Sequence, residues 1–323
     1  MSGLDLSGMR ADNTVMNLLP KLVVVVGPSG VGKTAISLEV AREFGGEIVN
    51  GDATAMYRYL NIGSAKPTLR ERCDIAHHLI DIAAPDEIIT VGQYQQLAYA
   101  AIDDILDRGK CPLLVGGSGL YIQAVVEGYM IPPVPPDDDL RWTLAREIEK
   151  RGHIWLQGVL RNLDPIAANV IDPANTRRLI RAIEVCRATG QPISSFWEKR
   201  DVRYFPVMVG LTRPLPELFA RIDIRVDIML QQGLVHEVES ILDMGYAPNV
   251  GALTAIGYRE VVSYLHGKIT LDAAISQIKQ ATRRLARRQI RGWFRSDDPR
   301  IHWFDVSIPD SVWCVAGFLA SYC

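Results

Sequence analysis

The sequence has few cysteines and no long apolar run, and both absences narrow the class of protein. Its 5 cysteines among 323 residues are odd in number and widely spaced, with no C-x-x-C pair. This pattern argues against a disulfide framework or a paired zinc site and indicates reduced thiols. No stretch approaches the roughly 18 apolar residues of a membrane span, and residues 1–20 lack the apolar core of a signal peptide. We therefore expect a cytoplasmic protein without a membrane partner, in which residues 1–20 form a disordered lead-in.

A large excess of charge of either sign is also missing. The chain carries 35 lysines and arginines against 37 aspartates and glutamates, a formal net charge of -2. Such a chain is not a general polycation, so a surface for nucleic acid has to come from a local basic cluster. Hydrophobic residues make up 48% of the chain, which is enough for a large core, and the length predicts about two domains.

The most specific motif is a G-x-x-x-x-G-K-T pattern. It consists of Gly27, Pro28, Ser29, Gly30, Val31, Gly32, Lys33 and Thr34. An apolar run at 22–26 predicts a buried strand before it, and apolar residues every four positions predict a helix over 34–44 after it. In this setting the pattern is a phosphate-binding loop, because backbone N–H groups and a helix N-terminus favour an anion. Lys33 adds a positive charge for a phosphate, and Thr34 is placed to ligate Mg²⁺.

One feature that is usual in P-loop ATPases is absent. Those enzymes hold Mg²⁺ with an aspartate at the end of an apolar strand. Here the strand predicted at 111–115 is followed by Gly116, Gly117 and Ser118. The absence weakens the ATPase interpretation and leaves room at this strand end for a bulky ligand.

Asp52 is the best candidate for a catalytic residue. It follows a short predicted strand at 47–50 and so lies at the carboxyl edge, where open α/β sheets bind ligands. Its carboxylate can serve as a general base or as an outer-shell partner of Mg²⁺, and the alternative is an aspartate that stabilises a turn. Arg221 and Arg225 share a face of a predicted helix. They either clamp a leaving diphosphate or pair with aspartates of the same helix on a solvated surface.

The local basic cluster lies in and just after a helix predicted over 271–293. Five arginines recur there at three- and four-residue steps and form one positive stripe: Arg284, Arg287, Arg288, Arg291 and Arg295. No acidic residue interrupts the stretch from 273 to 296. Because a solvated helix face usually mixes both signs, the stripe favours contact with a nucleic-acid backbone. A second cluster near 177–187 lies in a different predicted lobe, which indicates one polyanion held between two basic surfaces.

The order of predicted elements places the chain in the α/β fold class. We expect a P-loop NTPase-like parallel sheet flanked by helices, with an inserted small helical lobe and a helical C-terminal region. The proline-rich run at 132–136 marks the departure into the inserted lobe, placed at 123–200, and the alternative is a surface loop. The core domain then comprises 21–122 and 201–323. A third strand is predicted over 77–82.

Seven segments, in order, resemble the tRNA dimethylallyltransferases, or tRNA isopentenyltransferases. They are GPSGVGKT, GDATAMYRYLNIGSAKP, HHLIDI, LLVGGSGLY, RRLIRAIEV, AIGYRE and ATRRLARRQIRGWFR. The resemblance implies transfer of the dimethylallyl group of dimethylallyl diphosphate to the exocyclic amine of the adenine just 3′ of the tRNA anticodon. Diphosphate is released, and Mg²⁺ is the implied cofactor. The implied partners are a tRNA anticodon stem-loop and dimethylallyl diphosphate. No obligate protein partner is inferred, and we expect a monomer.

The resemblance also assigns roles to individual residues. Three are implied to be catalytic: Asp52 as the general base, Arg225 as an arginine that handles the allyl diphosphate, and Ser29, where the family often has threonine. The segment from Ser29 to Thr34 matches the diphosphate-binding loop. The positions that match tRNA contacts are Asp52, Ala53, Thr54, Ala55, Ser118, Arg141, Arg177, Arg178, Arg181, Arg283, Arg284, Arg287 and Arg288.

The segment after the general base departs from the family pattern. Many members read D-S-x-Q there, whereas this chain has Asp52, Ala53, Thr54 and Ala55. The hydroxyl and amide that would help to hold the adenine are therefore missing from those positions. Thr54 offers a hydroxyl that points the other way. We expect the reaction class to hold, and the departure leaves nucleotide selectivity and rate open.

Three other functions stay open at this point. One is an isopentenyltransferase that acts on free adenine nucleotides, against which the arginine stripe argues. A P-loop small-molecule kinase is the second, and the Gly-Gly-Ser end of the strand at 111–115 argues against it. The third is an RNA-binding P-loop module without activity, which would have no use for Asp52.

Overall fold

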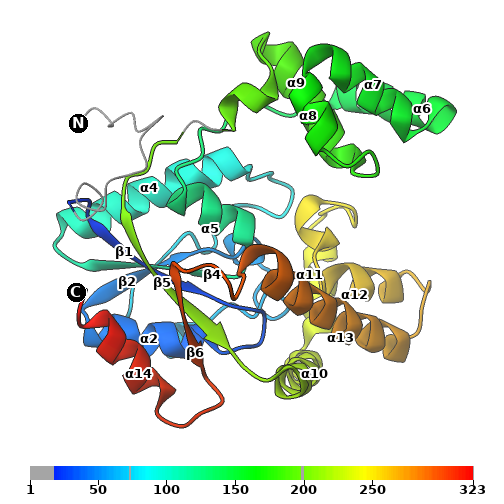
Figure 1. Ribbon diagram of the computed structural model, residues 1–323. Coiled ribbons are helices and arrows are strands. Elements are labelled where there is room, and N and C mark those ends of the chain that lie inside the picture. The colour runs from blue at the N-terminus through cyan, green and yellow to red at the C-terminus, as the bar shows by residue number, and fades with distance from the viewer. Residues whose placement is uncertain (1–17, 73, 198–199, 323) are drawn as a thin grey trace. The chain divides into compact units, whose positions relative to one another are not determined.

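The computed structural model describes residues 18–72, 74–197 and 200–322 (Figure 1). Within them, Glu127–Val202 form a smaller compact unit, and the other described residues form a larger one. Most of the lead-in expected at 1–20 lies outside the described residues, as do Cys73 and Cys323. Cys186 is buried and Cys314 is exposed, both as free thiols. None of the helices in the described ranges is long and apolar enough to cross a membrane.

The larger unit is built on a six-stranded sheet with the order β3-β2-β4-β1-β5-β6. The strands are β1 (Lys21–Val26), β2 (Gly46–Asn50), β3 (His77–His78), β4 (Cys111–Gly116), β5 (Phe205–Thr212) and β6 (Ile301–Asp305). All neighbouring strands run parallel. The predicted parallel sheet is therefore confirmed, with the apolar β1 at its centre.

Helices cover both faces of this sheet (Figure 1). One face carries α2 (Lys33–Glu43), α10 (Leu215–Gln231) and α14 (Ser311–Leu319), and the other carries α4 (Val91–Asp107) and α5 (Gly119–Val126). Val23 and Val25 of β1 pack in the first layer, while Val24 and Val26 pack in the second. Because successive side chains of a strand point to opposite faces, a strand buried on both sides has to be apolar throughout.

Further helices, which lie between β5 and β6 in the sequence, extend the larger unit. They are α11 (Leu234–Asp243), α12 (Tyr258–Leu265) and α13 (Leu271–Arg288). With α10 they enclose a core that includes Leu60, Leu234 and Tyr258. The helix expected to run to Trp293 is α-helical only to Arg288, and Gln289–Trp293 form a π-helix, η4.

The third strand predicted over 77–82 is wrong beyond His78. Leu79 and Asp81 have φ angles of 61° and 58°, which end the extended conformation. The Asp81 carboxylate pairs with Lys66 at 2.5 Å, and its N–H donates to the carbonyl of Ala55. The chain therefore turns away from the sheet edge to pack on the segment that follows β2. A short 3₁₀ helix, η1 (Thr54–Met56), and α3 (Leu69–Arg72) lie between β2 and β3.

A buried ion cluster lies at the amino ends of β2 and β4. Glu47, which is only 3% exposed, accepts hydrogen bonds from both terminal nitrogens of Arg108, from Lys110 at 2.7 Å and from His78 at 2.7 Å. The hydrogen bonds from Arg108, ahead of those from Lys110 and His78, hold the pKa of Glu47 well below its usual range. The charge that β2 carries into the core is thus neutralised within the protein.

The smaller unit is helical. Its helices are α6 (Asp138–Arg151), α7 (His153–Leu163), α8 (Pro165–Val170) and α9 (Thr176–Thr189), with the 3₁₀ turn η2 (Ile193–Phe196). Side chains of Asp137, Asp164 and Asn175 cap α6, α8 and α9 by accepting backbone N–H bonds. Leu156, Leu160 and other apolar residues form a core of its own.

Candidate functional site

The phosphate-loop residues lie between β1 and α2, as the motif predicts. Gly27, Gly30 and Gly32 have φ angles of 151°, 84° and 119°. A side chain at Gly27 would bring its Cβ to 2.7 Å from the carbonyl oxygen of Leu211, so the loop needs glycine there. α2 begins without a side-chain cap. Its first N–H groups therefore stay available to an anion.

This loop lies at the topological switch point of the sheet. The connection after β1 enters α2 on one face, and the connection after the neighbouring β4 enters α5 on the other. Diverging connections open a crevice at the carboxyl ends of the two strands, and open α/β sheets bind ligands in such a crevice. The loops after β1, β2 and β4 all contribute to this edge (Figure 1).

Asp52 follows β2 at the same edge. The Asn50 side chain fixes its backbone, accepting from the Asp52 N–H at 3.0 Å and donating to the Asp52 carbonyl at 2.9 Å. Asp52 Oδ1 accepts from the N–H and hydroxyl of Thr54, at 3.1 and 2.8 Å. Oδ2 of Asp52 has no partner among the described residues. The carboxylate is held in place with one oxygen open for chemistry.

The residues after Asp52 are arranged around its carboxylate. The Thr54 hydroxyl bonds Asp52, and Ala55 is buried. The Ala53 N–H donates to the hydroxyl of Ser118 at 3.0 Å, and the Ser118 N–H donates to the Gly51 carbonyl at 3.1 Å. Ser118 thereby joins the end of β4 to the end of β2. A tRNA contact by its hydroxyl stays a prediction.

Two cations near Asp52, Lys33 and Arg225, have lowered pKa values. Lys33 Nζ donates to the carbonyls of Gly27 and Pro28, at 2.9 and 3.1 Å. Burial, which has the largest effect, and nearby Arg225 together lower the pKa of Lys33 to about 8, against the opposing effect of Asp52. Burial also lowers the pKa of Arg225, whereas Asp52 raises it. Arg225 forms no hydrogen bond or ion pair with any residue that the structure describes.

Arg221 does not pair with an aspartate of its own helix α10, which was one alternative offered by the sequence. Arg221 Nε donates to the carbonyl of Gly30 in the phosphate loop at 3.2 Å. Asp223 instead pairs with Arg283, and Asp227 pairs with Lys279, each at 2.6 Å. The aspartates of α10 are therefore engaged by α13, and Arg221 is directed towards the phosphate loop.

Several basic side chains in and around the arginine stripe already have partners within the protein. Two of the basic residues of α13, Lys279 and Arg283, are compensated by α10, although the sequence around them has no acid. Arg284 donates to Gln280 at 3.0 Å, Arg287 lies over the Phe219 ring at 4.8 Å, and Arg295 pairs with Asp297. Arg288 and Arg291 are exposed and form no ion pair within the described ranges. They are the strongest candidates for contact with an outside polyanion.

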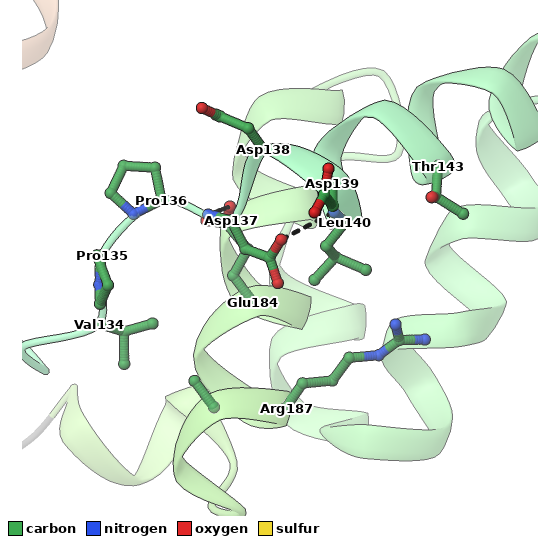
Figure 2. Close-up of a pocket in the computed structure, with 11 residues that line it drawn as sticks. Val134, Pro135, Pro136, Asp137, Asp138, Asp139, Leu140, Thr143, Glu184 and Arg187 are labelled. Carbon is green, nitrogen blue, oxygen red and sulfur yellow. Dashed lines mark hydrogen bonds between the residues drawn. The ribbon is translucent and has the colours of Figure 1, made fainter.

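In the smaller unit, the expected tRNA-binding arginines separate into two groups. Arg141 donates to Glu184 at 2.6 and 3.1 Å, and Arg181 donates to it at 3.3 Å. Glu184 is buried, so these two arginines neutralise an internal charge. Arg177 and Arg178 are exposed. An open pocket of about 830 Å³ lies within this unit, and Figure 2 shows Glu184 and Arg187 on α9 facing it across from the start of α6.

Two side chains that hold loops near the candidate site carry no signal in the sequence. Glu237 accepts the N–H groups of Asn61, Ile62 and Gly63 and so anchors the loop after η1. Gln289 accepts the Ser29 N–H at 2.9 Å and donates to the Gly117 carbonyl at 2.8 Å. Both act on residues far away in the chain, which periodicity and spacing do not reveal.

The fold and site define a P-loop α/β protein that brings a carboxylate and two cations together at the carboxyl edge of its sheet. A family model described as IPP transferase matches residues 55–297. The chain belongs to the IPP transferase family, as the resemblance in its motifs indicated.

Relatives match along most of the chain. The tRNA dimethylallyltransferase of Roseiflexus castenholzii is 48% identical over 292 residues, which cover 90% of this chain and 94% of that protein. The tRNA dimethylallyltransferase of Desulforudis audaxviator is 45% identical over 293 residues, with the same two coverages. The similarity extends over both described units.

Solved structures show the same fold. The tRNA isopentenylpyrophosphate transferase of Bacillus halodurans is similar with a TM-score of 0.69 and 39% identity, covering 93% of this chain and 96% of that one. A eukaryotic dimethylallyltransferase acting on tRNA is similar with a TM-score of 0.76 and 26% identity, covering 88% of this chain and 74% of that one.

Proposed function

We propose that the protein transfers the dimethylallyl group of dimethylallyl diphosphate to the exocyclic amine of the adenine 3′-adjacent to the anticodon of a tRNA. The observation that carries this proposal is the arrangement of Asp52. Its carboxylate has one open oxygen and lies at the sheet edge that also bears the phosphate loop, Lys33 and Arg225. A general base and a diphosphate site at one edge are what this transfer requires.

The residues divide the reaction between them. The amine nitrogen forms a bond to the first carbon of the allyl group while the bond from that carbon to the diphosphate oxygen breaks, and diphosphate leaves with the electron pair. Asp52 takes the proton that the amine loses. The loop N–H groups, Lys33 and Arg225 stabilise the charge that develops on the leaving diphosphate.

Mg²⁺ fits this site through Thr34. Thr34 is exposed at the first turn of α2, and its hydroxyl has no partner among the described residues. No group of three or more His, Cys, Asp or Glu side chains suited to a metal occurs in the described ranges. A hard cation here would therefore take the Thr34 hydroxyl and oxygens of the substrate as ligands. When bound, Mg²⁺ would neutralise charge on the diphosphate.

The nucleic-acid partner is proposed from exposed charge. Four exposed arginines are suited to phosphates of an anticodon stem-loop: Arg288 at the end of α13, Arg291 in η4, and Arg177 and Arg178 on α9. We assign the smaller unit, Glu127–Val202, the role of the tRNA-gripping lobe. An adenine within a loop has to be extruded from its stack to reach a carboxylate at the sheet edge.

The test is a transfer assay with a choice of acceptors. The protein is incubated with Mg²⁺, labelled dimethylallyl diphosphate and one of three acceptors: an anticodon stem-loop, AMP or ATP. Label on the stem-loop alone supports the proposal. Label on AMP or ATP supports the enzyme class that acts on free nucleotides. Binding of the stem-loop without transfer to any acceptor contradicts the proposed chemistry.

A further inference from the structure

Gln289 is a buried polar residue for which the proposed reaction gives no role. It is 4% exposed and is the first residue of the π-helix η4. Its side-chain oxygen accepts from the Ser29 N–H, and its side-chain nitrogen donates to the Gly117 carbonyl. Ser29 belongs to the loop after β1, and Gly117 follows β4. One amide therefore bridges the segments that follow β1 and β4.

The backbone around Gln289 passes over the carboxyl edge of the sheet. Ala286 packs in the layer of α2 and α10, whereas Phe294 packs in the layer of α4 and α5 on the opposite face. The Phe294 N–H donates to the Gln289 carbonyl at 3.0 Å, which closes the wider π turn. Such turns within α-helices occur frequently at functional sites. Here the turn holds Gln289 inward while Arg288 and Arg291 remain exposed.

The glycine at 117 makes room for this bridge. A side chain there would bring its Cβ to 2.6 Å from Gln289 Nε2 and 3.6 Å from Lys33 Nζ. The next residue, Ser118, accepts from the Ala53 N–H. A continuous set of contacts thus runs from the phosphate loop through Gln289, Gly117 and Ser118 to the segment that carries Asp52.

We infer that Gln289 is a positioning residue that holds the phosphate loop and the Asp52 segment at their working separation. The inference rests on the proposed function, because only that reaction requires the two segments to be held at a fixed distance. A diphosphate on the loop and a base on the other segment act on the same carbon–nitrogen bond. A displacement of about 1 Å between such groups costs up to about 100-fold in rate.

The test compares Gln289→Met with Gln280→Met. Methionine keeps the length of the side chain and removes both hydrogen bonds. Gln280 is an exposed glutamine of α13 that contacts Arg284 and lies outside the site, so it is the matched control. We expect Gln289→Met to lower the single-turnover transfer rate by about 10- to 100-fold and to weaken binding of inorganic diphosphate. Stem-loop affinity should change less than about twofold, since the residue does not face solvent.

A double variant separates positioning from a general loss of structure. If Gln289 acts through Ser118, the variants Gln289→Met and Ser118→Ala should be non-additive. The double variant would then be no slower than the slower single variant. Fully multiplicative losses, or a rate for Gln289→Met within about twofold of wild type, would overturn the inference.

Failure of the proposed function has a different signature. A wild-type protein that transfers nothing to the stem-loop contradicts the proposed function alone. The Gln289 inference is then decided by diphosphate binding. Weaker binding in Gln289→Met than in Gln280→Met supports the bridge, and equal binding rejects it.

Discussion

The two edges of the same parallel sheet hold charged side chains in opposite ways. At the amino edge, Glu47 is surrounded by Arg108, Lys110 and His78, and both of its oxygens are engaged. At the carboxyl edge, Lys33 bonds only to carbonyl oxygens, and Arg225 has no bonded partner among the described residues. The first cluster is complete without a ligand, and the second has positive charge in excess.

This difference supports the proposal that the carboxyl edge binds a diphosphate, whereas the amino edge holds a structural ion cluster. Charges removed from water lower the stability of a protein unless they are paired. Two cations without an ion pair are therefore retained where they serve a function such as binding an anion. The lowered pKa values of Lys33 and Arg225 report that cost, whereas the lowered pKa of Glu47 reports a favourable interaction. An anion such as diphosphate would satisfy the carboxyl edge.

The largest effect should come from Asp52, the carboxylate with an open oxygen. Asp52→Asn keeps the size of the side chain and removes the base, so the transfer rate should fall by about 10²- to 10⁴-fold. Stability and stem-loop affinity should stay close to wild type. Single-turnover transfer and thermal unfolding measure the two expectations. An active Asp52→Asn protein would show that another group takes the proton.

Glu47→Gln tests the amino edge, where the charge is paired within the protein. Removing the carboxylate leaves Lys110 and His78 without this partner and Arg108 with Asp104 alone, and should lower the free energy of unfolding by about 3 kcal/mol. Because the pKa of Glu47 is depressed in the folded protein, its stabilising effect is present above its unfolded pKa and is lost as the pH falls. The variant should therefore lose less stability than wild type on acidification. Denaturant unfolding at several pH values measures this, and diphosphate affinity should not change.

Arg225→Met should show the reverse pattern. Removing a partly buried cation that has no bonded partner among the described residues should leave the unfolding midpoint unchanged or raised. Affinity for inorganic diphosphate should fall by about tenfold or more, the usual value of a charge-assisted hydrogen bond. Calorimetric titration and thermal unfolding measure the two effects. If Arg225→Met destabilises the protein as strongly as Glu47→Gln does, the contrast between the edges fails.

Lys33 should make the affinity of the carboxyl edge for diphosphate depend on pH. A bound diphosphate favours the charged lysine and raises its pKa, so affinity is full below the free-protein pKa of about 8 and is lost as the pH rises above it. The loss should approach tenfold per pH unit in that window. Titrations from pH 7 to 10 measure it, with Lys33→Arg as the control because arginine stays charged. A wild-type profile parallel to that of Lys33→Arg would assign the pH dependence to the ligand.

The smallest effect concerns the exposed arginines. Arg288→Ala with Arg291→Ala should reduce the salt dependence of stem-loop binding, by about 0.7 in slope for each phosphate that the protein no longer neutralises. Lys279→Ala is the matched control, because Lys279 already has a partner in Asp227. Binding measured from low to high salt gives the slopes. An equal change in the control would assign the effect to overall charge.

Local patterns in the sequence predicted much of the sheet and the loop. The apolar run of β1 and the glycines of the phosphate loop act through their own backbone, so their structure follows from neighbouring residues. The end of β3 at His78 was not predictable in this way, because it depends on Asp81 meeting Lys66 and Ala55.

The missed features all depend on partners far away in the chain. Asp223 and Asp227 of α10 neutralise two basic side chains of α13. The sequence of α13 does not reveal this, because no acidic residue lies near those side chains in the chain. The π turn at Gln289 occurs where the helix passes from one face of the sheet to the other. Sequence periodicity records which face of a helix is apolar, and it does not record which element the helix meets.

The position of β1 also has a consequence for synthesis of the chain. β1 is the central strand, yet one of its neighbours, β5, follows the entire smaller unit in the sequence. During translation the strand that leads into the phosphate loop pairs with β4 first and stays open on its other side until Phe205–Thr212 have emerged. Nascent chains that stop before β5 should therefore expose an unpaired, valine-rich edge and depend on chaperones.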